Sequence, residues 1–307
     1  TAGQSIDASE KIDANLEIVR IHDGSHTDLD GATRSFSGRI GIEIHGSSSQ
    51  SYPKQGFRFE VRDEQGEDQN EALLGMSDES DWVLHAPYSD KTLLRNALAY
   101  ELGRQLAEDT GEWQPRSRLC ELYLDGSYHG VYLLVERVKR GNERVDFEPV
   151  ASSADTGDIT GPYIVKLDQG RNSYWSTAYG NLFSYVYPRY DSITSEQANY
   201  LQDWFGRFET MLWSSGWTDE ESGYSAWIHV ESFVDHFLLY ELSHNIDAYR
   251  LSTYFWKEPD EEGGRLHAGP IWDFDRAYGN VDYCSCQTTD GWTHESLDSC
   301  GCYGQFA

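Results

Sequence analysis

The sequence predicts an α+β protein of two parts, a β-rich N-terminal part at residues 1–150 and a mainly helical C-terminal part at residues 151–307. Three observations support this division. Alternation of apolar and polar residues, and one short apolar run, predict strands at 16–21, 39–45, 56–62 and 82–85. Apolar residues at helical spacing predict helices at 91–107, 195–212 and 230–242. Between these regions, a polar stretch with Gly and Ser at 151–161 predicts a connector.

The predicted helices have distinct end and face signals. Asp90 is a suitable N-cap for the first helix, whose leucines form a stripe that we expect to face the core: Leu94, Leu98, Leu102 and Leu106. Thr194 and Gln197 have the spacing of a capping box at the start of the second helix. The third helix is apolar over most of one side, which predicts a buried core helix.

The first part also contains a hairpin signal. Asp125-Gly126 lies between strand-like segments at 118–124 and 129–138, and this dipeptide favours a tight two-residue turn. The resulting order is strands, a helix and a hairpin, which is also the order in the small lobe of a protein kinase. The second part adds helices and a β-hairpin before Gly269, so we predict an atypical, kinase-like fold of two lobes.

Composition limits the classes of partner. The 307 residues are 38% hydrophobic and 14% aromatic, as expected of a globular chain. Lys and Arg number 24 against 52 Asp and Glu, a net charge of −28 that disfavours nucleic acid and anionic membrane surfaces. No run approaches the roughly 18 apolar residues that cross a bilayer, so we expect no membrane insertion. The start lacks Met and a signal peptide, which predicts a piece of a longer multidomain protein.

The cysteines indicate an oxidising compartment. Four of the five form two C-x-C pairs: Cys284, Cys286, Cys300 and Cys302. Zinc knuckles use a longer C-x-x-C spacing, so disulfides are the favoured interpretation, and the two arrangements that join one pair to the other are sterically easier than bonds within a pair. These bonds predict an extracellular or cell-surface location. Cys120 lies alone in a strand-like segment and is interpreted as a small buried hydrophobe.

Two aspartate loops follow the third predicted helix. Asp247 comes directly after that helix, and Asp273-Phe274-Asp275 comes after the next predicted hairpin. Phosphoryl transfer requires one carboxylate that orients the attacking hydroxyl and another that holds Mg²⁺ against the phosphates. In protein kinases a metal-binding Asn lies five positions after the catalytic Asp, and that position is Ser252 here. The pattern therefore matches a kinase in order but not in every residue.

A series of short segments resembles the family of spore-coat protein H (CotH) kinases, an atypical kinase group of spores and secreted bacterial proteins. The segments, in order along the chain, are GSSSQSYPK at 46–54, LLGM at 73–76, DWVL at 81–84, DKTLLRN at 90–96, GVYLLVE at 130–136, GPYIVKLD at 161–168, NID at 245–247 and GPIWDFD at 269–275. Because they extend from about residue 40 to near the end, the resemblance does not depend on one motif.

The resemblance implies a role for each of several residues, with ATP as co-substrate and Mg²⁺ or Mn²⁺ as cofactor. Asp247 corresponds to the catalytic Asp. The implied metal ligands are Asp273, Asp275 and Ser252. Nucleotide contacts are implied for Lys54 and the preceding Ser48 turn, for Glu136 where a hinge would meet adenine, and for Arg95 and Lys166. A phosphoacceptor Ser or Thr on an extracellular or surface protein would be the substrate.

Each of these residues has a structural alternative. Lys54 could be a solvated strand residue, Asp247 a loop residue after a helix, and Asp273 an Asx-turn residue. Glu136, Arg95 and Lys166 could be ion-pair partners. The sequence therefore leaves two functions open, an active kinase and a catalytically weak or inactive kinase-like module in surface adhesion or assembly. A third, weaker hypothesis is carbohydrate binding through exposed Trp residues such as Trp175 and Trp213.

Overall fold

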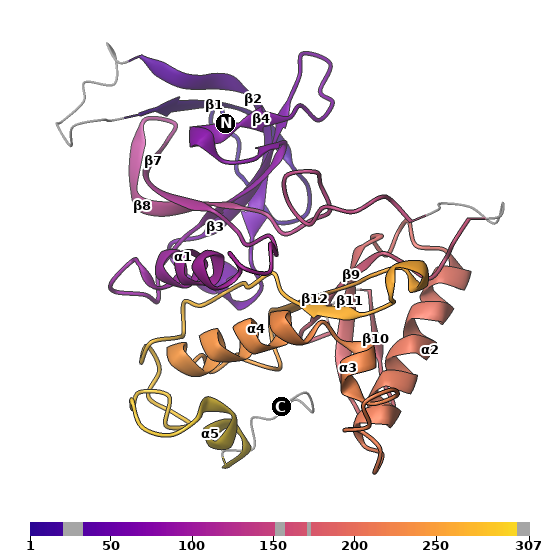
Figure 1. Ribbon diagram of the computed structural model, residues 1–307. Coiled ribbons are helices and arrows are strands. Elements are labelled where there is room, and N and C mark those ends of the chain that lie inside the picture. Colours follow the sequence, from indigo (N-terminus) through magenta and orange to yellow (C-terminus); the bar gives the residue numbers. More distant parts are fainter. Residues whose placement is uncertain (21–32, 151–156, 171–172, 300–307) are drawn as a thin grey trace. The chain divides into compact units, whose positions relative to one another are not determined.

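A computed structural model of the chain describes residues 1–20, 33–150, 157–170 and 173–299 (Figure 1). The chain is mixed α/β and rich in strands, and it forms two compact units. Unit 1 comprises Thr1–Ala97 and Pro115–Arg137, and unit 2 comprises Leu98–Gln114 and Val138–Ala307. The chain therefore passes finally into the second unit after Arg137 rather than at residue 150, and residues 98–114 belong to the second unit.

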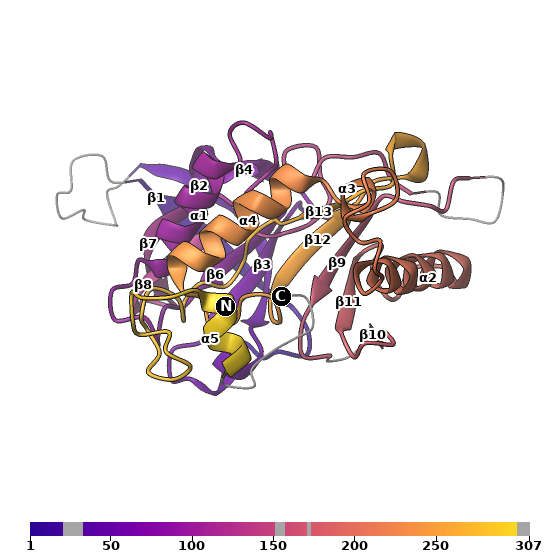
Figure 2. The ribbon, with the colours of Figure 1, turned by 60° about the horizontal axis from the view of Figure 1, so that its bottom comes forward.

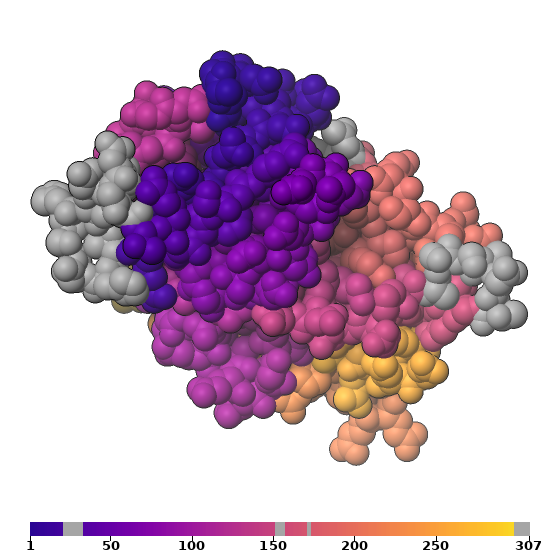
Figure 3. Space-filling model, turned by 90° about the horizontal axis from the view of Figure 1, so that it is seen from above, coloured from indigo at the N-terminus to yellow at the C-terminus, as the bar shows by residue number. Residues whose placement is uncertain are grey.

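Unit 1 is built on a six-stranded antiparallel sheet with the order β1-β2-β3-β6-β8-β7. The strands are β1 (Ile12–Val19), β2 (Arg34–His45), β3 (Gly56–Arg62), β6 (Asp81–His85), β8 (Ser127–Glu136) and β7 (Ser117–Leu124). Two short strands, β4 (Glu71–Ala72) and β5 (Asp78–Glu79), pair with each other, and two 3-10 turns follow β2 and β4, namely η1 (Ser48–Ser51) and η2 (Leu73–Gly75). Figure 3 shows much of the outer surface of this unit in indigo and purple.

The alternation seen in the sequence places apolar side chains on the covered face of this sheet. Ile42 pairs with Phe59 across β2 and β3, and both are at most 5% exposed. The core continues through the residues Ile40, Phe57, Val61, Leu73, Met76, Trp82, Leu84, Tyr132 and Leu134. The predicted hairpin is confirmed, because Asp125 and Gly126 both have positive φ and join β7 to β8, as a tight primed turn requires.

Helix α1 (Arg95–Leu106) begins later than the sequence predicts and buries a different face. Asp90 lies five residues before this start and is not the N-cap that the sequence predicts, although its side chain accepts from the backbone nitrogen of Arg95 at 2.9 Å. Leu94 and Leu98, expected in the core, are 49% and 47% exposed, whereas Ala99 is fully buried. The first two leucines of the stripe are therefore exposed and the last two are partly buried, while Ala99 and Tyr100 lie on the covered face.

Unit 2 contains a five-stranded antiparallel sheet, which corrects the expectation of a mainly helical second part. Its order is β10-β11-β9-β12-β13. The strands are β10 (Tyr174–Ser176), β11 (Leu182–Tyr187), β9 (Tyr163–Leu167), β12 (Thr253–Lys257) and β13 (Leu266–Ala268). These strands are short, and three of them lie in a region without clear alternation, so the sequence pattern predicted only the last two.

Helices complete unit 2. They are α2 (Ser195–Leu212), α3 (Tyr224–Trp227), α4 (Val230–Ser243) and α5 (Thr293–Ser299), with a 3-10 turn η3 (Asp260–Glu262). Figures 1 and 2 show α2 beside β11, and side chains of both elements share one core. That core includes the buried residues Tyr163, Val165, Leu167, Trp175, Phe183, Leu201, Trp204, Phe205, Phe208, Phe255 and Leu266. No helix in the described part of the chain is both long and apolar enough to cross a membrane.

The two longest helices of unit 2 give different outcomes. The capping box of α2 is confirmed, with Gln197 donating its backbone N–H to the Thr194 hydroxyl at 3.2 Å and its side chain accepting from the Thr194 backbone at 2.9 Å. Helix α4 buries Leu239 and Tyr240, but Leu242 is 66% exposed. One side of the helix is therefore buried and another is exposed, so the predicted buried core helix is wrong. Its apolar composition does not distinguish the two sides.

Candidate functional site

The end of helix α4 positions Asp247. The helix terminates at His244, which has a left-handed backbone conformation (φ 46°), and a loop then leads to β12. In this loop the backbone N–H of Asp247 donates to the Asn245 side chain at 3.1 Å. The Asp247 carboxylate accepts from Arg250 Nη2 at 3.1 Å and is only 7% exposed as a residue. The loop thus holds a buried carboxylate in a defined orientation.

A second loop, which follows β13, brings Asp273 to the same place. The Ser252 hydroxyl donates to Asp273 Oδ2 at 3.2 Å, and this bond joins the two loops across 21 positions of sequence. Ser252 and Asp273 both have positive φ, 52° and 66°. Such backbone conformations are uncommon for residues other than Gly and gather at functional sites, and Asp tolerates them better than most residues.

Several carboxylates act on one another in this cluster. Burial, followed by the neighbouring charges of Asp275 and Asp247, raises the pKa of Asp273 to about 7. Burial also raises the pKa of Asp247, although the positive charges of Arg276 and Arg250 oppose the effect. A carboxylate with a raised pKa lies where negative charge is poorly compensated, and a bound cation would compensate it.

Unit 2 also supplies an ammonium group to this cluster. Lys166, on β9, forms an ion pair with Asp168 at 2.5 Å. Burial alone would lower the pKa of Lys166, but the nearby Tyr254, Asp168 and Asp273 outweigh it and leave the pKa raised. Lys166 is therefore charged and close to Asp273, which agrees with both interpretations of this residue, an ion-pair partner and a contact for phosphate.

The cluster suits a hard divalent cation. Its donors are carboxylate and hydroxyl oxygens from Asp273, Asp275 and Ser252, which Mg²⁺ and Mn²⁺ prefer. Mg²⁺ keeps several waters and needs only one or two protein carboxylates when phosphate oxygens complete its shell. The cation would neutralise phosphate charge, while the Asp247 carboxylate, held by Arg250, could accept a proton from a hydroxyl.

The other sequence-predicted residues lie in unit 1. The Lys54 ammonium donates to the Val131 carbonyl and lies 4.5 Å from the centre of the Tyr132 ring. Burial lowers the pKa of Lys54. Ser48 is exposed at the start of η1, and its carbonyl accepts from the Ser51 hydroxyl at 2.7 Å. Lys54 is thus not a solvated strand residue but one held against the sheet.

Glu136 and Arg95 make the ion pairs that the sequence offered as their alternative roles. Glu136 is completely buried, and its carboxylate accepts from the backbone and hydroxyl of Ser77 and from the backbone and side chain of Arg116. Arg95 forms an ion pair with Asp90 at the start of α1. Both side chains are therefore engaged in holding unit 1 together.

A comparison with protein families identifies the family of this chain. The model of the CotH kinase protein family matches residues 42–300, most of the 307-residue chain. The chain belongs to the CotH kinase family. Membership supports a kinase-like function and, with it, the use of a nucleotide and a divalent cation. A comparison with curated proteins found no match.

The sequence analysis missed two charged residues of the candidate site around Asp247 and Asp273. Asp168 was quoted only as the last letter of GPYIVKLD, although it pairs with Lys166 and adds to the charge at Asp273. Arg276, which acts on Asp247, directly follows the DFD segment. Asp168 lies two positions after Lys166, and Arg276 directly follows Asp275, so closeness in sequence to predicted site residues was the available signal. Only the fold shows that both charges act on the aspartates.

The described cysteines are in different states. Cys286 is present as a buried thiol, which donates to the Cys284 carbonyl at 3.6 Å, so the expected disulfide at Cys286 is not shown. Cys284 is disulfide-bonded, and because Cys300 and Cys302 lie outside the described residues, the identity of its partner stays a prediction. Cys120 is partly buried in β7, and burial raises the pKa of its thiol to about 11, which agrees with its interpretation as a small hydrophobe.

The hypothesis of carbohydrate binding required Trp175 and Trp213 to be exposed, and only Trp213 is. Trp175 is 7% exposed and stacks on Phe183 at 5.3 Å in the core of unit 2. Trp213 is 66% exposed and stacks on Tyr179 at 6.0 Å. Since Trp175 completes the core, the two Trp residues do not form a common surface for a sugar.

Proposed function

We propose that this CotH-family chain is an atypical protein kinase that transfers phosphate from ATP to a Ser or Thr of an extracellular or surface protein. The observation that carries the proposal is the hydrogen bond between Ser252 and Asp273, which brings the metal-type loop to the catalytic-type loop of Asp247. In this proposal units 1 and 2 correspond to the small and large lobes of a kinase.

The residues of unit 2 have distinct roles in this reaction. Asp247 orients the acceptor hydroxyl and accepts its proton, as the buried carboxylate of a kinase catalytic loop does. Asp273 binds Mg²⁺ or Mn²⁺, with Asp275 and Ser252 as further ligands. Lys166 offers a positive charge near Asp273, where a phosphate oxygen would meet the cation. Each of these roles uses a side chain in the charge cluster described above.

The role of unit 1 is nucleotide binding, and it rests on the family resemblance. Lys54 would bind phosphate, supported by the hydroxyl and backbone groups of the turn at Ser48. The Lys54 ammonium would exchange its bond to the Val131 carbonyl for a phosphate oxygen. We also propose that the chain is part of a longer protein in an oxidising compartment outside the cell.

The test combines binding and transfer measurements on the purified chain. Titration calorimetry with ATP and Mg²⁺ or Mn²⁺ should give saturable heat, and label should pass from the γ-phosphate of ATP to Ser or Thr residues of surface proteins or of the chain itself. Asp247→Asn and Asp273→Asn should each lower transfer by roughly 100-fold or more. The matched control is Asp203→Asn, which removes an exposed carboxylate from α2 in the same unit. Absence of both heat and label transfer in the wild type would overturn the proposal.

A second function is favoured by two observations. Lys54 is bound to a backbone carbonyl, and Ser252 replaces the Asn that ligates a second metal in protein kinases. We therefore keep a catalytically weak or inactive kinase-like module in surface assembly as the alternative. It predicts that ATP binds with a divalent cation but that no labelled product forms above the level of Asp247→Asn.

A further inference from the structure

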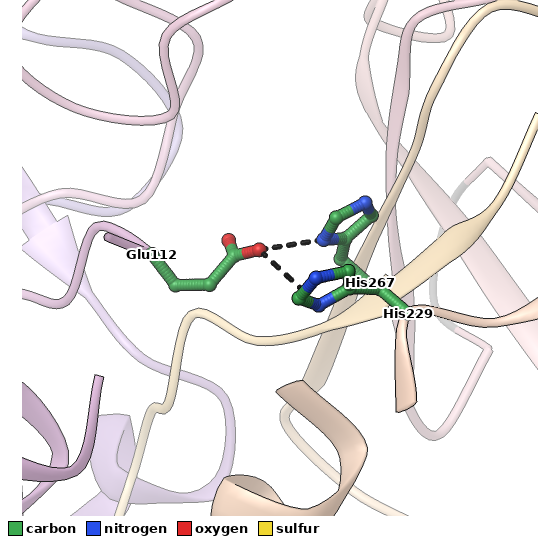
Figure 4. Close-up of side chains that lie close together, drawn as sticks. All are labelled: Glu112, His229 and His267. Carbon is green, nitrogen blue, oxygen red and sulfur yellow. Dashed lines mark hydrogen bonds and ion pairs between the residues drawn. The ribbon is translucent and has the colours of Figure 1, made fainter. Parts of the chain in front are cut away.

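Three side chains of unit 2 that no sequence motif connects lie together and belong to neither aspartate loop. Glu112 follows α1, His229 is the N-cap of α4, and His267 lies in β13. Glu112 Oε1 is 2.5 Å from His267 Nδ1 and 4.0 Å from His229 Nδ1. Figure 4 shows the carboxylate pointing at both imidazole rings. These ligand-type atoms all lie within 4.8 Å of one another.

His267 is held in an orientation typical of a metal-binding histidine. Its Nε2 lies 2.8 Å from Glu258 Oε1, and its ring stacks on Trp256 at 3.8 Å and on His229 at 4.4 Å. If His267 carries its proton on Nε2 and donates it to Glu258 in a hydrogen bond, Nδ1 presents a lone pair toward Glu112. Metal-bound histidines commonly donate their second N–H to a carboxylate in this way.

His229 Nδ1 is the third ligand-type atom of the cluster, and its lone pair takes part in capping α4. The backbone N–H of Ser232 donates to His229 Nδ1 at 3.4 Å, which requires that this nitrogen be unprotonated. The remaining nitrogen, Nε2, lies 3.7 Å from Glu231. A metal cation at His229 Nδ1 would therefore replace the long bond from Ser232 N–H, whereas the short contact between Glu112 Oε1 and His267 Nδ1 already requires a proton or a cation between the two atoms.

The two distances from Glu112 bracket the value for a tetrahedral cation. With metal–ligand bonds of about 2.0–2.1 Å, tetrahedral ligand atoms lie about 3.3 Å apart. Glu112 Oε1 is closer than this to one histidine and farther from the other. A movement of the Glu112 carboxylate by less than about 1 Å would equalise the two, which is within the reach of a side chain with three rotatable bonds.

A small cavity beside Glu112 offers a position for a further ligand. It has a volume of about 10 Å³, close to the space of one water. Its lining includes Glu112, Asp235 and His236. Neither ring nitrogen of the buried His236 has a hydrogen-bond partner within the described structure, and a buried group of this kind often marks a water or an ion.

We propose that Glu112, His229 and His267 bind a divalent transition-metal ion of the Zn²⁺ class, with a water from the adjoining cavity as fourth ligand. Two imidazoles and one carboxylate suit this class and do not suit Mg²⁺, which prefers oxygen. The site is independent of the proposed nucleotide site. By joining the segment after α1 to α4 and β13, the ion would stabilise unit 2.

Spectroscopy on the metal-stripped chain tests the proposal directly. Co²⁺ added after chelator treatment should give the visible absorption of a tetrahedral site with one equivalent bound, and Zn²⁺ should displace it. Because Trp256 stacks on His267, its fluorescence should change in parallel. Zn²⁺ at 100 times its Kd should also raise the unfolding free energy by about 2.7 kcal/mol, the linkage value for a hundredfold excess over Kd.

Variants separate this site from others. Glu258 contacts the ligand His267 but not the ion, so Glu258→Gln should weaken Zn²⁺ binding by roughly 10- to 100-fold. His229→Gln and Glu112→Gln, which remove proposed ligands, should each weaken it by more. His294→Gln is the matched control, since His294 contacts Glu241 at 3.3 Å elsewhere in unit 2. Circular dichroism before metal addition checks that each variant is folded.

Three outcomes would overturn the proposal. One is a folded wild-type chain that binds neither Co²⁺ nor Zn²⁺, which would identify the cluster as a protonated histidine between carboxylates. The second is unchanged affinity in His229→Gln and Glu112→Gln. The third is the intense near-ultraviolet absorption of thiolate-bound Co²⁺, which would place the ion at the cysteines. ATP binding has no bearing on any of these results, so the kinase proposal can fail separately.

Discussion

Replacing Asp273 by Asn should make the metal-free chain more stable while removing its response to Mg²⁺. Asp273 is a carboxylate whose pKa is raised to about 7, first by burial and then by Asp275 and Asp247. Asn has the same shape, can accept the Ser252 hydroxyl, and tolerates the left-handed backbone (φ 66°) that Ala would not. The substitution therefore removes charge with little change in geometry.

The magnitude follows from the pKa. Each tenfold change in proton affinity corresponds to about 1.4 kcal/mol. A rise from 3.8 to about 7 thus costs the ionised folded state about 4 kcal/mol at most. Water reaching the partly exposed side chain reduces this cost, so we expect a gain of about 2 to 4 kcal/mol in Asp273→Asn at about pH 8, or roughly 4 to 8 °C in Tm.

The gain should depend on pH in a defined direction. A carboxyl with a raised folded pKa binds more protons in the folded chain than in the unfolded chain between pH 3.8 and about 7. The unfolding free energy of the wild type should therefore fall as pH rises from 3.8 to about 7, and the variant should show no such fall. The difference should be near zero at about pH 4 and constant above about pH 7.5.

Thermal unfolding in chelator at a series of pH values provides the assay, with Asp203→Asn as the control for loss of one surface charge. Repeating the series with millimolar Mg²⁺ should stabilise the wild type and Asp203→Asn but not Asp273→Asn. A variant that is less stable than the wild type at about pH 8, or a gain that is the same at every pH, would refute the electrostatic reasoning.

The remaining predictions concern stability. Glu136→Gln should destabilise by about 3 kcal/mol in urea unfolding, because Arg116 would keep a partly buried charge without its partner; if Glu136 instead contacts adenine, ATP affinity falls at unchanged stability. Thr194→Ala should cost about 1 kcal/mol by removing the capping bond to Gln197, and Thr194→Ser should restore it. Burial lowers the pKa of His236 to about 4. Stability should therefore fall by about 3 kcal/mol as pH drops from 6.5 toward 4, and His236→Leu, measured in chelator, should lack this fall.

Local signals explain which elements were predictable. The Asp125-Gly126 turn and the Thr194 capping box depend on residues close in sequence, and both are confirmed. The buried face of α1 was not predictable, because Leu94 and Leu98 are exposed while the smaller Ala99 is covered. Hydrophobic periodicity marks a face that is able to be buried, and packing against other elements decides which face is buried.

The candidate site was predictable in part for a similar reason. Asp247 and Asp273 occur in family segments, so the sequence identified both, but only the bond from Ser252 to Asp273 shows that the two loops meet. The same segments suggested Glu136 as a nucleotide contact, whereas its carboxylate is surrounded by Ser77 and Arg116. A segment identifies a position, and the neighbours from other strands determine what its side chain touches.

The sequence by itself determined the family, the α+β class, the hairpin and the helix cap, since each depends on residue types at short spacing or on ordered segments. The tertiary structure alone decided the five-stranded sheet of unit 2 and the convergence of Glu112, His229 and His267. Glu112 lies 117 positions before His229, and His229 lies 38 positions before His267. Their ligand atoms come within a few ångströms only because packing brings distant backbone segments together, which no short-range pattern encodes.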